Sequence, residues 1–197
     1  MCLIVFAWRV IPAVPLVAAA NRDEFYQRAT APAAPWPEHP QIFAGRDLQA
    51  GGSWMGITQP SECGAYNGFN LVLGDRDTLI WFSNRGDDDP RNGKPLEPGV
   101  YGLSNALLDA PWPKVVKTKA QFASLLCLGA PDEAFFEMLA DTAPAPDQRL
   151  PETGVPLDLE RMLSAVRIES PSYGTRTSTV VKLYADAHAT LHEMLIQ

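Results

Sequence analysis

A cysteine at position 2 is the first residue in this chain with the chemistry of a nucleophile. Cys2 follows the initiator Met1 and opens an apolar run over residues 3–6. Because cysteine is small, an aminopeptidase that removed Met1 would leave Cys2 as the N-terminal residue. The thiol and a free α-amine would then share one carbon, and the amine, with a reference pKa of about 7.7–8.0, could act as base for the thiol. The alternative is that Cys2 is a small apolar residue that begins a buried strand.

Four more polar residues complete a candidate acyl-transfer site. Such a site needs a nucleophile, a base, groups that orient the base and donors for the oxyanion. A guanidinium at Arg22 would lower the thiol pKa, and Asp23 could orient the α-ammonium. Asn105 offers an amide N–H to a tetrahedral oxyanion, a type of donor whose loss costs about 2.7–4 kcal/mol. Arg176 is a second cation that could enter the same pocket.

Each of these residues also has a purely structural interpretation. Arg22 and Asp23 could form an ion pair at the end of a hairpin. Asn105 could cap the turn that follows it. Arg176 could lie on a solvated strand edge. The sequence leaves these alternatives open.

A predicted β-hairpin explains how residues 22 and 23 would reach Cys2. Residues 2–9 and 16–20 are apolar runs, and the proline-bearing spacer between them is short. In an antiparallel pair, the end of the second strand lies beside the start of the first. Asn21, which directly follows the second run, could be a turn residue.

The remaining elements predict an α+β protein with mostly antiparallel sheets. Residues 29–41 contain four prolines and predict an extended surface loop. Further strands are expected at residues 54–58, 69–73, 78–83, 100–103, 177–184 and 190–196. Helices are expected at residues 114–128, 131–139 and 157–166. Strands followed by helices and then by strands are typical of α+β folds, not of βαβ repeats.

Length, charge and hydrophobicity limit the number of domains, the partners and the cellular location that we expect. The 197 residues predict one domain over positions 1–197. A net charge of −7 argues against nucleic acid and anionic membranes as partners. No apolar run is long enough to span a membrane, and residues 10–20 lack the basic flank of a signal peptide, so we expect a cytoplasmic protein. The sequence makes no prediction of oligomeric state.

The sequence predicts neither a disulfide framework nor a metal site, and no bound cofactor. Its three cysteines are an odd number without CxxC spacing. The histidines fall in a predicted loop, a turn and a strand, at positions 39, 188 and 192. Three tryptophans could line a pocket for a flat apolar ligand, namely Trp8, Trp54 and Trp112.

Seven blocks of sequence together resemble the NRDE family, also called the transport-and-Golgi-organisation family. The blocks are MCLI at 1–4, AANRDEF at 19–25, AGRD at 44–47, AGGSWMG at 50–56, YNGFN at 66–70, YGLSN at 101–105 and YGTRTSTV at 173–180. They occur in order over nearly the whole chain. The combination of NRDE with the AGRD and AGGxW blocks is highly specific.

That family is similar to N-terminal-nucleophile hydrolases of the penicillin acylase and bile-salt hydrolase kind. The resemblance implies a four-layer αββα sandwich in which the nucleophile begins a central strand. By motif, Cys2 would be the nucleophile with Arg22 and Asp23 around it, Asn105 the oxyanion asparagine and Arg176 a late pocket arginine. The implied reaction is hydrolysis of a linear amide (C–N) bond.

The resemblance also implies an alternative class of function. Eukaryotic members of the family are linked to haem trafficking and to lipid or acyl-CoA metabolism. The chain could therefore be a non-catalytic carrier of haem or of an acylated metabolite, with Cys2 as a thiolate ligand to haem iron. An inactive family member is a third alternative.

One departure from the family pattern concerns the middle of the chain. Family members usually carry several tens of residues, including a strand and a helical segment, between the strand near residue 57 and the YNGFN block. Here only residues 59–65 connect them. The resemblance therefore implies a fold that lacks part of one sheet.

Overall fold

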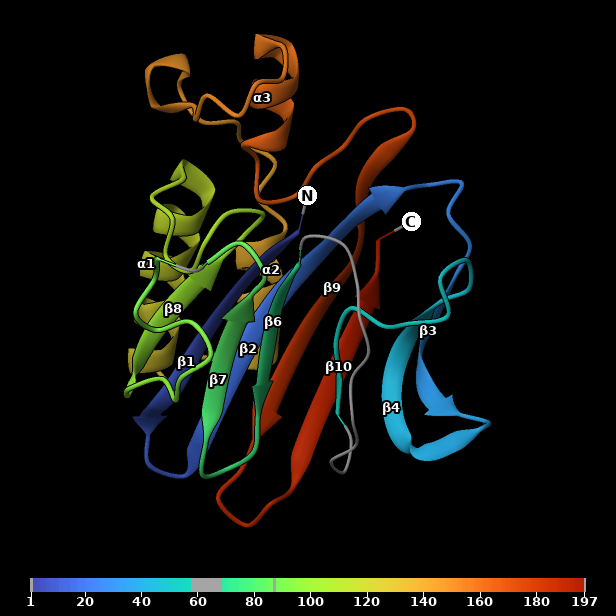
Figure 1. Ribbon diagram of the computed structural model, residues 1–197, viewed down its shortest axis with the longest axis vertical. Coiled ribbons are helices and arrows are strands. Elements are labelled where there is room, and N and C mark those ends of the chain that lie inside the picture. The colour runs from blue at the N-terminus through green and yellow to red at the C-terminus, as the bar shows by residue number, and fades with distance from the viewer. Residues whose placement is uncertain (1, 58–68, 87, 197) are drawn as a thin grey trace.

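The computed structural model describes residues 2–57, 69–86 and 88–196. Its largest element is a five-stranded antiparallel sheet in the order β10-β9-β2-β1-β8 (Figure 1). The strands are β1 (Leu3–Ile11), β2 (Val14–Phe25), β8 (Gly99–Leu103), β9 (Tyr173–Leu183) and β10 (Ala189–Leu195). The chain begins in a strand that has a neighbour on both sides.

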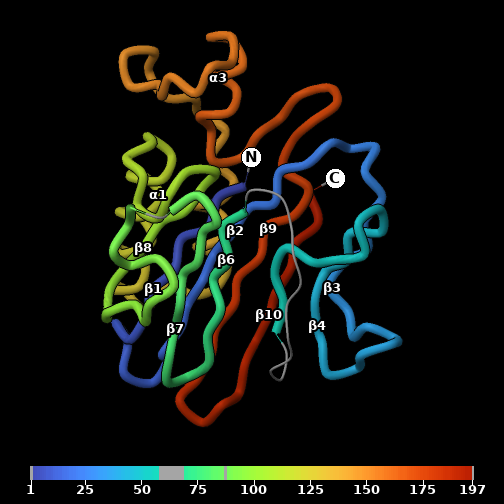
Figure 2. The backbone as a smooth tube through the Cα atoms, in the orientation of Figure 1, coloured from blue at the N-terminus to red at the C-terminus, as the bar shows by residue number. Residues whose placement is uncertain are grey.

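The hairpin of β1 and β2 has the antiparallel arrangement predicted from the two apolar runs. Leu3 pairs with Asn21 and Trp8 pairs with Leu16. One further step in this register places Cys2 opposite Arg22. Figure 2 follows the backbone from β1 into β2 and shows β9 beside β2 for most of its length. The end of β2 therefore lies between the start of β1 and β9.

Three α-helices follow the central strands. They are α1 (Pro113–Cys127), α2 (Asp132–Leu139) and α3 (Leu157–Leu163), with a 3-10 helix at Asp147–Arg149 between α2 and α3. The predicted helices are confirmed within three residues at each end. Helices α1 and α2 pack on one face of the sheet, where Val115, Phe122 and Phe135 meet Val5 and Val17 in a buried core.

A second β layer covers the opposite face of the five-stranded sheet. Strands β6 (Asn70–Gly74) and β7 (Leu79–Ser83) form a hairpin that crosses the front of the sheet in Figure 1. Leu79 and Trp81 of β7 pack against Phe6 and Trp8 of β1. Because side chains alternate along a strand, β1 and β2 supply both cores.

The prediction of a loop over residues 29–41 is wrong. That region contains most of the hairpin of β3 (Thr30–Trp36) and β4 (His39–Asp47), to which β5 (Gly56–Ile57) adds two residues. Strand β3 lies at the edge of its sheet, where a proline costs no ladder hydrogen bond on the open side. The register shifts in β3 fall beside Pro32 and Pro35, Pro37 lies in the turn between the strands, and His39 begins β4 instead of lying in a loop.

The predicted class of fold, α+β with mostly antiparallel strands, is confirmed. The described residues form three layers: α1 with α2, the five-stranded sheet, and the second β layer. The outer helical layer of the expected four-layer sandwich is not among them. The short connection at residues 59–65 and the last residue of the strand expected at 54–58 lie outside the described residues. Within the described chain, no helix is long and apolar enough to cross a membrane.

Candidate functional site

Three atoms of Cys2 contact the two strands beside β1. The backbone nitrogen donates a hydrogen bond to Oδ1 of Asn105 at 3.0 Å, and the carbonyl oxygen accepts one from Oγ of Ser104 at 2.7 Å. The thiol donates a long hydrogen bond, 3.8 Å, to the backbone oxygen of Asp23. The end of β2 and the turn after β8 therefore fix the position of Cys2.

Burial raises the pKa of the Cys2 thiol. Although the residue keeps exposed surface, protein atoms surround the sulfur and disfavour its charged form. The carboxylate of Asp23 raises the thiol pKa further. The guanidinium of Arg22 acts in the lowering direction that the sequence predicted, but the effect of burial is larger, so the net direction is opposite to the expectation.

Arg22 is a buried cation on the face of β2 that turns toward β4 and β5. Its guanidinium carbon lies 4.2 Å from the centre of the Trp54 ring. Its Nη2 is 3.8 Å from Oδ2 of Asp47 and 3.9 Å from Oε2 of Glu24. Because neighbours along a strand point to opposite faces, Arg22 pairs with these two carboxylates and not with Asp23. The ion pair between Arg22 and Asp23 that we considered from the sequence is therefore wrong.

Asp23 is a buried carboxylate that is only partly hydrogen-bonded. Its Oδ1 accepts a hydrogen bond of 2.6 Å from the Thr175 hydroxyl, which itself accepts one of 2.9 Å from the backbone nitrogen of Ile168. Its Oδ2 has no hydrogen-bond partner among the described residues. Burial raises the pKa of Asp23 to about 6, against the opposing effects of Lys114 and Thr175. Among the described residues, the carboxylate makes no hydrogen bond to the nitrogen or the side chain of Cys2, so the orienting role predicted for it stays a prediction.

Sequence reasoning missed Lys114, in the first turn of α1. The side chain is only 2% exposed, and its ammonium has no hydrogen-bond partner within the described residues. Burial lowers the pKa of Lys114, while the charges of Asp23 and Cys2 oppose this shift. Two signals could have found it: a lysine in the first turn opposes the helix dipole, and Lys114 lies four residues before buried Thr118 on the inward stripe of α1.

Asn21, two residues before Asp23, is a structural clamp and not a turn residue. Its Nδ2 donates hydrogen bonds of 2.9 Å to the carbonyl oxygens of Leu139 and Val166. Its Oδ1 accepts one of 2.7 Å from the Ser178 hydroxyl. The amide thereby joins β2 to the end of α2, to the segment after α3 and to β9.

Arg176 holds the connection that leaves β2. It occupies a bulge in β9, where Arg22 pairs with Thr177 and Asp23 pairs with Thr175. Its Nη1 donates to the carbonyl oxygens of the three residues Phe25, Tyr26 and Arg28, at 3.1, 3.3 and 3.1 Å. These contacts place Arg176 beyond the end of β2, whereas Cys2 is hydrogen-bonded to Asn105 and to the backbone oxygen of Asp23.

Asn105 is held in place by the second β layer. Asn70 of β6 donates hydrogen bonds to the carbonyl oxygens of Ala106, at 2.9 Å, and Ser104, at 3.4 Å. The Oδ1 of Asn70 accepts a hydrogen bond of 3.1 Å from the indole nitrogen of Trp81. Asn105 itself is exposed and presents its oxygen to Cys2. The oxyanion-donating role predicted for its N–H therefore stays a prediction.

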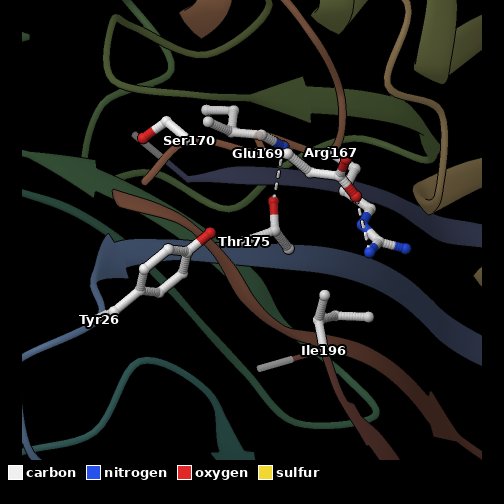
Figure 3. A pocket seen from close by; sticks show the side chains of 7 residues that line it. Tyr26, Arg167, Glu169, Ser170, Thr175 and Ile196 are labelled. Carbon is white, nitrogen blue, oxygen red and sulfur yellow. Dashed lines mark hydrogen bonds and ion pairs between the residues drawn. The ribbon is translucent and has the colours of Figure 1, made fainter. Parts of the chain in front are cut away.

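A cavity of about 420 Å³ is lined by Thr175, the hydrogen-bond partner of Asp23, but not by Asp23 itself. Figure 3 shows the Thr175 side chain at its wall with Tyr26, Arg167 and Ile196 around it. Cys2 does not line this cavity. The three tryptophans considered as a common wall are also separated: Trp8 is in the core, Trp54 lies under Arg22, and Trp112 lies beside Lys114.

The sequence matches one family profile along both halves of the chain. The profile described as Transport and Golgi organisation 2 matches residues 1–65 and 60–197. The chain belongs to the Transport and Golgi organisation 2 family. The resemblance to NRDE proteins is thereby confirmed.

Curated relatives in the Transport and Golgi organisation 2 family align over most of the chain. The "Transport and Golgi organization protein 2 homolog" of Homo sapiens is 30% identical over 257 residues, which cover 98% of this chain and 92% of that protein. The Bos taurus homolog is also 30% identical over the same coverage. The Drosophila melanogaster protein of this family is 40% identical over 63 residues, 29% of this chain and 22% of that protein.

The alignment also locates the segment that this member of the family lacks. Its 257 positions exceed the 197 residues of the chain by 60, so at least 60 positions have no counterpart here. The two matched ranges of the profile meet at residues 60–65. This agrees with the short connection that the motif spacing indicated at residues 59–65.

Proposed function

We propose that the chain is an N-terminal-nucleophile cysteine amidohydrolase that cleaves linear amides. The observation that carries the proposal is the hydrogen bond from the Cys2 nitrogen to Asn105 Oδ1. Once Met1 is removed, that nitrogen is the α-amine, and the same acceptor holds it next to its own thiol. We further propose that the three described layers correspond to three layers of an αββα sandwich.

In the proposed reaction the α-amine takes the proton of the Cys2 thiol. The thiolate then attacks the substrate carbonyl carbon, and the oxyanion that forms is stabilised by the Asn105 N–H and by backbone N–H groups. The α-ammonium returns its proton to the leaving nitrogen as the C–N bond breaks, which leaves a thioester. Water, deprotonated by the amine, attacks the thioester and releases the carboxylic acid and the thiol.

The neighbouring charges support this proposal. The Arg22 guanidinium favours the thiolate, and Lys114 places a second positive charge near Cys2 and Asp23. Arg176 acts at a distance in this scheme, because it fixes the residues that follow β2. We assign it a positioning role.

Active-site labelling tests the proposal. Protein whose intact mass shows that Met1 is absent is incubated with an electrophilic acyl probe, and the adduct is mapped by mass spectrometry. We expect labelling on Cys2 that is lost in Cys2→Ala and kept in Cys127→Ala, since Cys127 is an exposed cysteine at the end of α1. Labelling that is the same in Cys2→Ala and the parent protein would refute the nucleophile.

A further inference from the structure

A second cavity, of about 550 Å³, lies between the start of α1 and the segment that connects α2 to α3. Its volume is within the range of about 300–1,000 Å³ that is typical of small-molecule sites. Four prolines, at positions 111, 113, 144 and 146, form part of its walls. Because proline fixes its own φ angle, these walls are rigid, and little conformational entropy is lost when a ligand packs on them.

The charges that line this cavity all have the same sign. Lys114, Lys117 and Arg149 are lining residues, and no aspartate or glutamate is one. The chain as a whole carries a net charge of −7, so this local excess of cations is opposite to the average surface. A concave site lined by one sign of charge attracts ligands of the opposite sign.

The three cations differ in how far they are already neutralised. Lys117 forms an ion pair with Asp141, which does not line the cavity. Arg149 is exposed at the rim and has no ion-pair partner within the described chain. Lys114 is buried at the base, where its ammonium has no hydrogen-bond partner among the described residues. Two of the three basic side chains that line the cavity, Lys114 and Arg149, therefore have no ion-pair partner within the described chain.

Apolar side chains also line the cavity. Val166 is buried at the base, and Val116 stands at the rim with 56% of its surface exposed. The Ser164 hydroxyl is already used, since it donates to the carbonyl of Arg161 and accepts from the nitrogen of Ala145. Apart from the cations, the cavity thus offers mainly hydrocarbon surface to a ligand.

We propose that this cavity binds a small anion that carries an apolar group, such as a carboxylate or phosphate monoester with a hydrocarbon chain. The anionic end lies at the rim between Arg149 and Lys117, and the hydrocarbon packs on the prolines, Val116 and Val166. Lys114 adds a third basic group to the same lining. This binding does not require Cys2, so it is independent of the proposed hydrolysis.

Isothermal titration calorimetry with four probes of equal chain length tests this site. The probes are octanoate, octyl phosphate, octanol and octylamine. We expect at least one of the two anions to bind at least tenfold more tightly than octanol and octylamine, and the tighter anion identifies the preferred head group. Equal affinity for octylamine and for both anions would overturn the proposal.

Variants place the binding in this cavity. Arg149→Gln should weaken the anion about tenfold, which is the usual size of one charge-assisted contact. Val116→Trp should abolish binding by filling the mouth, and its exposed position makes it compatible with folding. Lys94→Gln, which removes an exposed cation elsewhere, should leave affinity unchanged. Affinity that is the same in the parent, Arg149→Gln and Val116→Trp proteins would refute the site.

The same titrations separate this site from the proposed enzyme. Cys2→Ala should bind octanoate or octyl phosphate with unchanged affinity. If the anion binds but the acyl probe does not label Cys2, the cavity stands and the hydrolase does not. If the probe labels Cys2 but neither anion binds, the proposed binding site is refuted and the proposed hydrolase is supported.

Discussion

Asn21 and Asp23 lie two residues apart on the same face of β2, and each is the centre of a buried polar cluster. The two clusters differ in how many of their polar atoms have hydrogen-bond partners. In the Asn21 cluster, which comprises Asn21, Ser178 and the carbonyls of Leu139 and Val166, the amide makes three hydrogen bonds. In the Asp23 cluster, which comprises Asp23, Lys114, Thr175 and Cys2, a carboxylate oxygen and an ammonium are left without partners among the described residues.

The difference separates a fully hydrogen-bonded amide, which joins several elements of the fold, from a carboxylate with one oxygen that lacks a partner among the described residues. A satisfied buried amide has one stable state, because every alternative leaves polar atoms unpaired. Burial raises the pKa of Asp23 to about 6, so its two protonation states have similar free energies near that pH. We therefore expect the Asn21 cluster to respond to mutation in stability and the Asp23 cluster to respond in pH dependence.

The largest expected effect is the loss of the Asn21 amide. Asn21→Ala leaves two buried carbonyls and one hydroxyl without their partner and should lower the free energy of unfolding by about 3–5 kcal/mol. Chemical denaturation measures the change. The matched control is Asn105→Ala, an exposed asparagine with one described hydrogen bond, which should cost about 1 kcal/mol or less. Equal losses in the two variants would break the comparison.

The next largest effect is a pH dependence of the free energy of unfolding, which arises from Asp23. Its pKa is raised by burial from 3.8 to about 6, so the folded chain binds this proton more tightly than the unfolded chain. The resulting stabilisation is fully present below pH 3.8 and is lost as pH rises through about 6. At 1.36 kcal/mol per pKa unit, the loss is about 3 kcal/mol.

Asp23→Asn removes that titration and so provides the measurement. The free energy of unfolding of the parent protein, minus that of Asp23→Asn, should fall by about 2.4 kcal/mol between pH 4 and pH 7, because part of the total is already lost at pH 4. Lys114→Met should shift this fall to higher pH, because the lysine charge lowers the Asp23 pKa. A difference that stays flat over this pH range would show that Asp23 does not titrate as described.

Arg176 is a cation whose guanidinium donates hydrogen bonds to backbone carbonyls, so we expect its loss to affect stability, as for Asn21. Arg176→Met removes contacts to the three carbonyls after β2 and should cost about 1–3 kcal/mol. Faster amide hydrogen exchange at residues 25–30 should accompany the loss. Arg85→Met, an exposed arginine, is the control and should change neither quantity. Unchanged exchange in Arg176→Met would argue against the clamp.

The smallest expected effect is on the reactivity of Cys2. In protein that retains Met1, burial raises the thiol pKa above its ordinary value of 9.0, and only the thiolate reacts with iodoacetamide. The alkylation rate of Cys2, followed by mass spectrometry, should still be rising at pH 9. Arg22→Met should slow alkylation at any lower pH, since it removes a charge that favours the thiolate. A plateau below pH 9 would contradict the direction of the shift.

The elements of the central sheet could be predicted because their pattern is local. Residues 2–9 and 16–20 are two apolar runs with a short spacer, and this alone indicates the register that brings β2 to Cys2. The hairpin of β3 and β4 was missed, because prolines exclude a strand only when both of its edges are paired, and the sequence does not reveal which edge is open.

The neighbours of Cys2 could be predicted where a sequence motif falls at a strand end that the sheet topology brings to Cys2. Cys2, Asp23 and Asn105 meet because the ends of β1, β2 and β8 meet. Lys114 was not predicted, because a lysine in an amphipathic helix normally faces water and its two sequence signals, the first-turn position and the spacing to Thr118, are weak beside that tendency. Arg176 occupies a bulge in β9 and contacts carbonyl oxygens of the residues after β2, a placement that the sequence does not reveal.

The Thr175 hydroxyl determines where Asp23 can carry a proton. Its oxygen already accepts from the Ile168 nitrogen, so its hydrogen points to Oδ1 of the carboxylate. A proton taken up by Asp23 therefore belongs on Oδ2. Uptake near pH 6 would convert that oxygen from an acceptor into a donor, near Lys114, whose charge opposes the uptake. The strand β9 thus sets the polarity of the group beside the thiol without touching the thiol.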